Sequence, residues 1–272
     1  MEKSLWGDKR YRMKLIFNIL IFTILTILTQ IGGVIYLLSL WISKIYKKGF
    51  IFKRFFIFSI LYLIATFLIV PIIAPIFKRV PVSDKLEPTN YLTILFNRNY
   101  VDPKLNKVLI KTQEYLSNTN IKVKYLDASF PFINGFPLFP HLSHNDGKKI
   151  DISFIYKDKN GNITNQKKSI SGYGVFVPIK KGEYNQTKYC KDRGYLQYDY
   201  PKYLTLGKIN SELVFSENGT KKLINAILKN REIGKIFIEP NLKTRMKLRN
   251  TKVRNHGCKA VRHDDHIHIQ VK

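Results

Sequence analysis

Residues 15–43 read LIFNILIFTILTILTQIGGVIYLLSLWIS and contain no charged side chain. A second uncharged stretch, FFIFSILYLIATFLIVPIIAPIF, covers residues 55–77. Each is longer than the roughly 20 residues that an α-helix needs to cross a hydrocarbon core of about 30 Å. A cleaved signal peptide has a shorter apolar core followed by a small-residue cleavage site, which neither stretch shows. Buried soluble helices are the alternative, but they rarely run this long without a polar face. The sequence therefore predicts two transmembrane helices, over residues 15–43 and 55–77.

Basic residues flank both predicted helices. Two crossings would return the chain to the side on which it began, so the N-terminal tail and everything after the second helix would share one side. Lys and Arg are nearly balanced between the tail and the segment joining the helices, so the positive-inside rule discriminates weakly. It favours a cytoplasmic joining segment, because the cations are denser there: Lys44, Lys47, Lys48, Lys53 and Arg54.

A short polar linker containing Pro81, Asp84 and Pro88 follows the second helix. The expected organisation is a membrane anchor with its linker over residues 1–84 and one soluble domain over residues 85–272. In that domain Asp102 and Pro103 read as the cap and first turn of a helix, and a second amphipathic helix covers residues 221–229. Strands are expected over residues 91–96, 121–126, 150–156, 173–177, 236–238 and 266–271. This mixture without a regular βαβ rhythm predicts an α+β fold with an antiparallel sheet.

The chain is strongly basic, with 46 Lys and Arg against 19 Asp and Glu and a net charge of +27. Such a charge suggests nucleic acid, anionic lipid or an acidic polymer as a neighbour, although a composition rich in Lys, Asn, Ile, Phe and Tyr explains it equally well. The two cysteines, Cys190 and Cys258, exclude a disulfide-dense scaffold and a cysteine-rich zinc module. They allow at most one intrachain bridge, and the sequence leaves open whether it forms.

Five of the six histidines fall into two clusters. The first is HLSHNDGKKID, residues 141–151, and the second is HDDHIH, residues 263–268, which leads into the strand predicted over residues 266–271. In a strand, His266 and His268 project from the same face. Imidazole and carboxylate groups form a ligand set suited to zinc, and three protein ligands with one open position are typical of catalytic zinc. Together the clusters predict a metal site, although each histidine alone is better explained as an ordinary core or surface residue.

The pattern His-x-Ser-His-x-x-Gly-x-x-x-Asp in the first cluster and His-x-x-His-x-His in the second resemble those of the penicillin-insensitive murein endopeptidases. That family belongs to the zinc peptidase superfamily of lysostaphin, D-Ala-D-Ala peptidases and hedgehog. Residues 234–243, GKIFIEPNLK, resemble the strand and turn that precede the second motif in the family. The resemblance covers residues 95–272, apart from about 157–215.

The resemblance implies that His144, Asp151 and His268 hold Zn²⁺. It places His266 beside the metal-bound water as a base or transition-state donor, with His141 and His263 flanking the site. Asp264 or Asp265 is a candidate for orienting an imidazole, although a solvated turn explains both equally well. No serine or cysteine nucleophile is needed, because the metal both activates water and polarises the carbonyl.

The leading interpretation is a metallopeptidase anchored in the bacterial inner membrane, with its catalytic domain facing the periplasm or the cell exterior. Its substrate would be the peptide cross-links of peptidoglycan, cut as an endopeptidase or carboxypeptidase. The first alternative is a zinc-containing relative that binds the cell wall without cutting it. The second is a membrane-tethered nucleic-acid module, but no nucleic-acid motif supports it and no such partner is expected. The sequence does not determine the oligomeric state.

Overall fold

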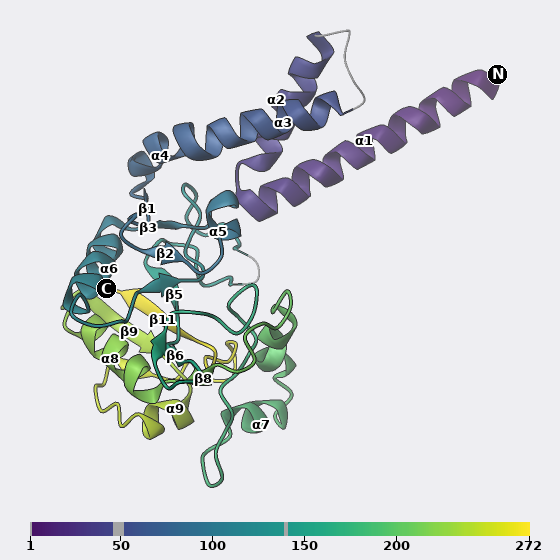
Figure 1. Ribbon diagram of the computed structural model, residues 1–272. Helices are drawn as coiled ribbons and strands as arrows, with labels where there is room; N and C mark the ends of the chain where they lie inside the picture. Colours follow the sequence, from purple (N-terminus) through teal and green to yellow (C-terminus); the bar gives the residue numbers. More distant parts are fainter. Residues whose placement is uncertain (1, 46–51, 139–140) are drawn as a thin grey trace.

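Three N-terminal helices extend away from a mixed α+β domain (Figure 1). The computed structural model describes residues 2–45, 52–138 and 141–272. Two helical stretches in this part of the chain, Lys9–Thr29 and Lys53–Phe77, are long and apolar enough to cross a membrane. The α+β class expected from the sequence is confirmed.

The predicted helix over residues 15–43 is wrong in one respect, because the structure divides it. Helix α1 (Glu2–Thr29) ends at Gln30, which has a φ of 67°, and α2 (Gly32–Ile45) begins two residues later. The Thr29 hydroxyl accepts a hydrogen bond from the Gly32 amide at 2.8 Å. A Cβ at Gly33 would lie 2.7 Å from the Phe22 carbonyl oxygen, so α2 approaches α1 as closely as it does only because this residue is glycine.

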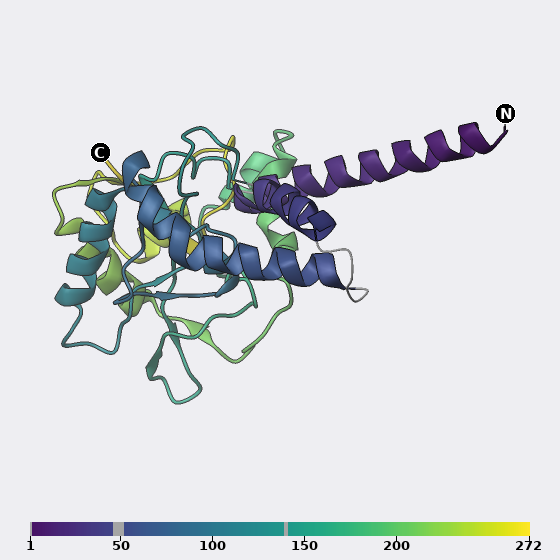
Figure 2. The same ribbon diagram turned by 90° about the horizontal axis from the view of Figure 1, so that it is seen from above.

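The second predicted helix is continuous. It runs through α3 (Lys53–Ile64), a π turn η1 (Ala65–Ile69), α4 (Val70–Ile73) and a 3₁₀ turn η2 (Ala74–Phe77). Helices α1 and α3 point in the same general direction and α2 runs back between their ends (Figures 1 and 2). The Tyr36 hydroxyl on α2 donates to Asn18 Oδ1 on α1 at 2.8 Å, so Tyr36 ties these two helices together.

Specific contacts fix the three helices to the domain. The side chain of Gln30 accepts a hydrogen bond from the Phe132 amide at 3.0 Å. The ring of Phe132 also packs edge-on against Phe77, at 5.2 Å between centroids. Further along, the Tyr62 hydroxyl donates to the Leu95 carbonyl at 2.7 Å. The loop that contains Phe132 leads to the first histidine cluster, so the helices brace one side of that loop.

A six-stranded mixed sheet forms the centre of the domain. Its central pairs are antiparallel and both edge pairs are parallel. The strand order is β10 (Val253–Arg254), β9 (Ile233–Phe237), β11 (His266–Val271), β5 (Lys149–Ser153), β4 (Lys124–Tyr125) and β2 (Glu87–Pro88). The expected antiparallel sheet is therefore present at its centre.

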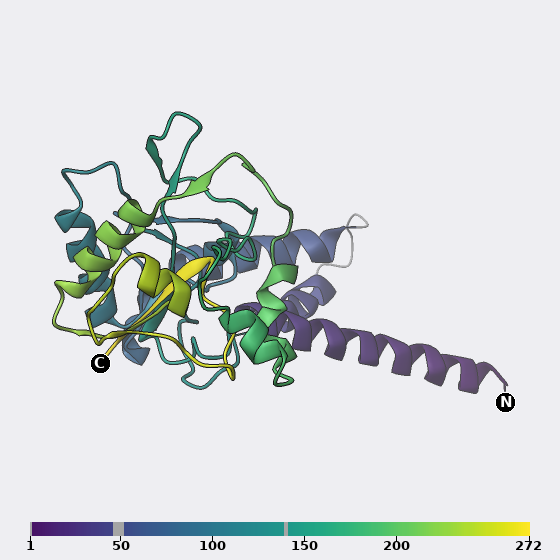
Figure 3. The same cartoon turned by 90° about the horizontal axis from the view of Figure 1, so that it is seen from below.

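Helices α6 (Pro103–Tyr115) and α8 (Glu217–Leu228) lie side by side and form the apolar core with the sheet (Figure 3). Because α6 and α8 cover one face of the sheet, the histidines lie on the opposite face. Asp102 caps α6 as predicted, accepting a hydrogen bond from the Lys104 amide at 2.8 Å. The remaining elements are β1 (Val80–Pro81), β3 (Tyr100–Val101), α5 (Leu92–Leu95), β6 (Tyr156–Lys157), β7 (Ile163–Thr164), α7 (Gln186–Lys191), η3 (Leu196–Tyr203), β8 (Val214–Phe215) and α9 (Pro240–Arg245).

Two predicted strands are wrong. Residues 91–96 form the helical turn α5, because the Asn90 side chain accepts the Leu92 amide and starts a turn. Residues 173–177 are irregular, since Gly174 adopts a φ of 80°. The backbone amides of Gly174 and Val177 bond to Asp265 Oδ2 and to the Asp264 carbonyl instead of to a strand.

Candidate metal centre

The site is built on the pairing of β5 with β11. In this antiparallel register His268 lies directly opposite Asp151, and His266 lies opposite Ser153. Residues two apart share a face, so Asp151, His266 and His268 all project from the sheet face that α6 and α8 leave free. The strand predicted over residues 266–271 is confirmed, and it carries two of the six candidate residues.

The loop ahead of β5 brings His144 onto the same face. A turn closes between the His144 amide and the His141 carbonyl oxygen at 2.9 Å. The His144 Nδ1 lies 3.1 Å from the Ala128 carbonyl, so Nδ1 carries the proton and donates it there. The other ring nitrogen, Nε2, then faces Asp151 and His268.

Three buried ligand atoms converge at this point. His268 Nδ1 lies 2.9 Å from Asp151 Oδ1, His144 Nε2 lies 3.1 Å from His268 Nδ1, and His144 Nε2 lies 3.2 Å from Asp151 Oδ1. Tetrahedral ligands at about 2.0–2.1 Å from a metal ion stand roughly 3.3–3.4 Å apart, close to this triangle. This buried His-His-Asp group could hold a metal ion.

His141 is a competitor for the third ligand position. Ligand atoms of His141, His144 and Asp151 also lie within 4.8 Å of one another. However, His141 Nδ1 lies 3.1 Å from Asp151 Oδ2 and 3.4 Å from Asp127 Oδ2. Burial alone would lower the pKa of His141, but these two carboxylates raise it to about 9. His268 Nδ1 and His144 Nε2 instead share the other oxygen of Asp151, Oδ1. The two sets have His144 and Asp151 in common, and the convergence on one carboxylate oxygen favours His268 as the third member.

His266 is held in place by a carboxylate. Its Nδ1 lies 2.5 Å from Asp265 Oδ1, and its Nε2 lies 3.6 Å from Asp151 Oδ2. The second oxygen of Asp265 accepts the Gly174 amide at 2.6 Å, which fixes the carboxylate itself. Of the two candidate orienting residues, Asp265 therefore contacts an imidazole, that of His266. Asp264 instead forms a bidentate ion pair with Arg262.

The rings of His263 and His256 line the site opposite the first cluster. The His263 ring centroid lies 4.9 Å from that of His266 and 5.7 Å from that of His268. Burial holds the pKa of His263 well below its usual value, so this imidazole is neutral. His256 packs on Phe237 at 4.3 Å and on His263 at 5.7 Å. All six histidines thus gather at one site, including His256, which the cluster spacing did not predict.

Sequence reasoning missed three other residues at the site. The Tyr173 hydroxyl donates to Asp151 Oδ2 at 2.8 Å, opposite the oxygen that faces His144 and His268. Asp127 contacts His141 and accepts a hydrogen bond from Arg98 Nε at 2.9 Å. These residues lie far from both histidine motifs in sequence, and the only signal for Tyr173 was its position between Gly172 and Gly174.

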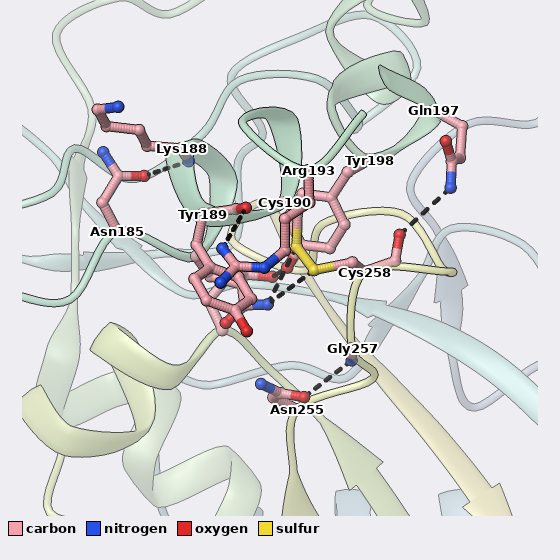
Figure 4. The surroundings of a disulfide bond; sticks show 12 residues. Asn185, Lys188, Tyr189, Cys190, Arg193, Gln197, Tyr198, Asn255, Gly257 and Cys258 are labelled. Atoms are coloured by element: carbon pink, nitrogen blue, oxygen red, sulfur yellow. Dashed lines mark hydrogen bonds between the residues drawn. A yellow bond between two sulfur atoms is a disulfide. The ribbon is translucent and has the colours of Figure 1, made fainter. Parts of the chain in front are cut away.

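A cleft of about 540 Å³ opens over the histidines. Its walls come from the first cluster, from η3 and from residues 256–261. The Cys190–Cys258 disulfide joins α7, which lies just ahead of η3, to the wall formed by residues 256–261 (Figure 4). The Cα atoms of the two cysteines are 5.2 Å apart. The bridge that the sequence left open is therefore formed. Closing a loop of this size stabilises a fold by about 4 kcal/mol on the chain-entropy model.

No protein-family model matches the chain, and no curated protein matches it closely enough to count as a relative. The nature of the site consequently rests on its own residues and geometry.

Proposed function

We propose that the protein is a membrane-anchored zinc metallopeptidase that hydrolyses the peptide cross-links of peptidoglycan. The observation that carries this proposal is the triangle of His144, Asp151 and His268 with the His266–Asp265 pair directly beside it. Two imidazoles and one carboxylate suit zinc by ligand type and number. The substrate follows from the resemblance of both histidine motifs to murein endopeptidases.

In the proposed hydrolysis, His266 and His141 have different roles beside the bound ion. Bound zinc would supply Lewis-acid polarisation of the scissile carbonyl and make water a better acid. His266 Nε2 faces the ligand cluster while Asp265 holds Nδ1, so His266 can take a proton from water and pass it to the leaving amine. His141 Nε2 is buried and has no hydrogen-bond partner in the described part of the chain. It lines the cleft, where an N–H donor stabilises a developing oxyanion.

The break between α1 and α2 bears on the orientation of the protein in a membrane. The N-terminal end of α1, the C-terminal end of α2 and the N-terminal end of α3 all point away from the domain (Figure 1). Lys9 to Lys14, Lys44, Lys53 and Arg54 therefore lie on one side, whereas Lys47 and Lys48 lie outside the described residues. We infer that α2 is a third crossing. The positive-inside rule then favours a cytoplasmic location for these basic residues.

This orientation puts the domain outside the cytoplasm, where peptidoglycan is found and where disulfides persist. Helix α2 has 14 residues and is about 21 Å long, shorter than a hydrocarbon core of about 30 Å, so this crossing requires a locally thinner bilayer. The formed Cys190–Cys258 bridge agrees with an oxidising compartment.

Cysteine labelling should show opposite sides for the tail and the domain. In a chain with Cys190 and Cys258 replaced by Ala, Lys9→Cys and Lys44→Cys should resist a membrane-impermeant thiol reagent in intact cells. Lys159→Cys, in an exposed turn, should be labelled. Equal labelling of Lys9→Cys and Lys159→Cys would show that α2 does not cross, as in a two-helix anchor.

Digestion of purified peptidoglycan tests the activity. The detergent-solubilised chain loaded with zinc should convert cross-linked muropeptides to monomers, read by mass spectrometry, and a chelator should stop the reaction. Restoring zinc should restore it. Zinc-dependent binding to peptidoglycan without any new product would instead identify a wall-binding protein.

A further inference from the structure

The sheet face that carries the candidate metal ligands also carries three basic residues, Lys149, Lys235 and Arg254. In the strand registers, Asp151 pairs with His268, His268 with Phe237, and Phe237 with Arg254. Two residues further along the same strands, Lys149 pairs with Gln270, and Gln270 pairs with Lys235. Because side chains two apart share a face, Lys149 and Lys235 project on the side of the histidines, about 7 Å along the strands from Asp151 and Phe237.

These three basic residues differ in whether an acidic side chain of the protein pairs with them. Lys149 forms an ion pair with Asp146 at 2.5 Å. Lys235 and Arg254 are exposed, and neither forms an ion pair with any described residue, although Arg254 donates to the Thr251 carbonyl. Two cations therefore face solvent beside the cleft without a counter-charge from the protein.

The ring of Phe237 links these cations to the cleft. His256 lines the cleft and packs on Phe237, the residue two positions after Lys235 on β9 and the register partner of Arg254. The Phe237 ring also packs on that of His268, at 5.5 Å between centroids. Lys235 and Arg254 therefore stand next to a residue that borders the histidines.

We propose that Lys235 and Arg254 form a subsite for a carboxylate of the peptide substrate, beside the scissile bond along strand β9. This inference rests on the proposed function, and it specifies a peptide that bears a free carboxylate near the bond that is cut. A carboxylate suits the subsite because a flexible ammonium and a planar guanidinium on neighbouring strands can both donate to it. A neutral, amidated peptide would leave both cations unpaired.

The test compares two cross-linked stem peptides that are identical except that one has free carboxylates and the other has carboxamides. The zinc-loaded full chain should show a KM roughly tenfold lower for the acidic peptide, and Lys235→Met should remove most of this preference while kcat changes little. Lys107→Met, an exposed lysine on α6 across the sheet, is the matched control and should keep the preference. Added salt should weaken the preference in the wild type.

Binding of fluorescently labelled peptides to His266→Ala by anisotropy separates this inference from the proposed activity. A preference for the acidic peptide that disappears in the His266→Ala, Lys235→Met double variant supports the subsite even if no peptide is cut. Equal affinity for both peptides, or a preference that Lys235→Met and Lys107→Met reduce alike, overturns the subsite and leaves the hydrolase proposal standing.

Discussion

His144→Ala and His268→Ala should each lose the bound zinc, whereas His141→Ala should keep it. Loss of one ligand from the triangle leaves two donors for the ion, one of them the Asp151 carboxylate. The fall in metal affinity should exceed the roughly 10- to 100-fold that follows loss of an outer partner of a ligand. Metal content, measured by mass spectrometry on protein dialysed against a weak chelator, should drop from about one ion per chain to a small fraction.

His141→Ala provides the sharp control, because this residue lies as near to Asp151 as the ligands do. In the structure, His141 Nδ1 contacts Asp151 Oδ2, not the Oδ1 that faces His144 and His268, and it also contacts the carboxylate of Asp127. Its loss should reduce activity and leave the zinc in place. The reverse result, in which His141→Ala loses zinc and His268→Ala retains it, would assign the ion to His141, His144 and Asp151.

The strand of the second motif was predictable because local sequence determines it. Residues 266–271 alternate, and the alternation alone places His266 and His268 on one face. The Asp102–Pro103 helix start was equally local. For the first motif, the spacing of His144 and Asp151 was visible in the sequence, but the way in which the loop folds back was not.

Other features depend on contacts between distant segments. Tyr173 reaches Asp151 only because glycines on both sides keep residues 173–177 out of a sheet. Asp127 becomes part of the site through Arg98 and His141, which no local pattern connects. Pairing of Cys190 with Cys258 likewise needed the fold, since sequence does not bring two Cα atoms within bonding range.

The division of the first apolar stretch had a local signal that hydropathy hides. Gln30, Gly32 and Gly33 interrupt the run without adding charge. A transmembrane helix is predicted from the length of an uninterrupted apolar run, and glycine does not interrupt such a run. Residues 15–43 were therefore predicted as one helix. The hydrogen bond from Gly32 to Thr29 and the close approach at Gly33 show that these residues form a turn.

His266→Ala should retain zinc and lose activity by about 10² or more, because it removes a proton acceptor without removing a ligand. Asp265→Asn should lose activity by roughly 10- to 100-fold. The substitution replaces the charged carboxylate that orients the His266 imidazole with a neutral amide, which holds the ring less firmly. Ser153→Ala is the matched control, because Ser153 lies opposite His266 in the register and its hydroxyl bonds only to the Phe154 carbonyl among the described residues.

The measurements are kcat on a cross-linked stem peptide and metal content on the same preparations. Added imidazole should partly restore the activity of His266→Ala but not that of His268→Ala, because only the former keeps the ion and leaves a space for a soluble base. Activity of His266→Ala equal to that of Ser153→Ala would remove His266 from the proton transfer. Loss of zinc from His266→Ala would instead make His266 a ligand.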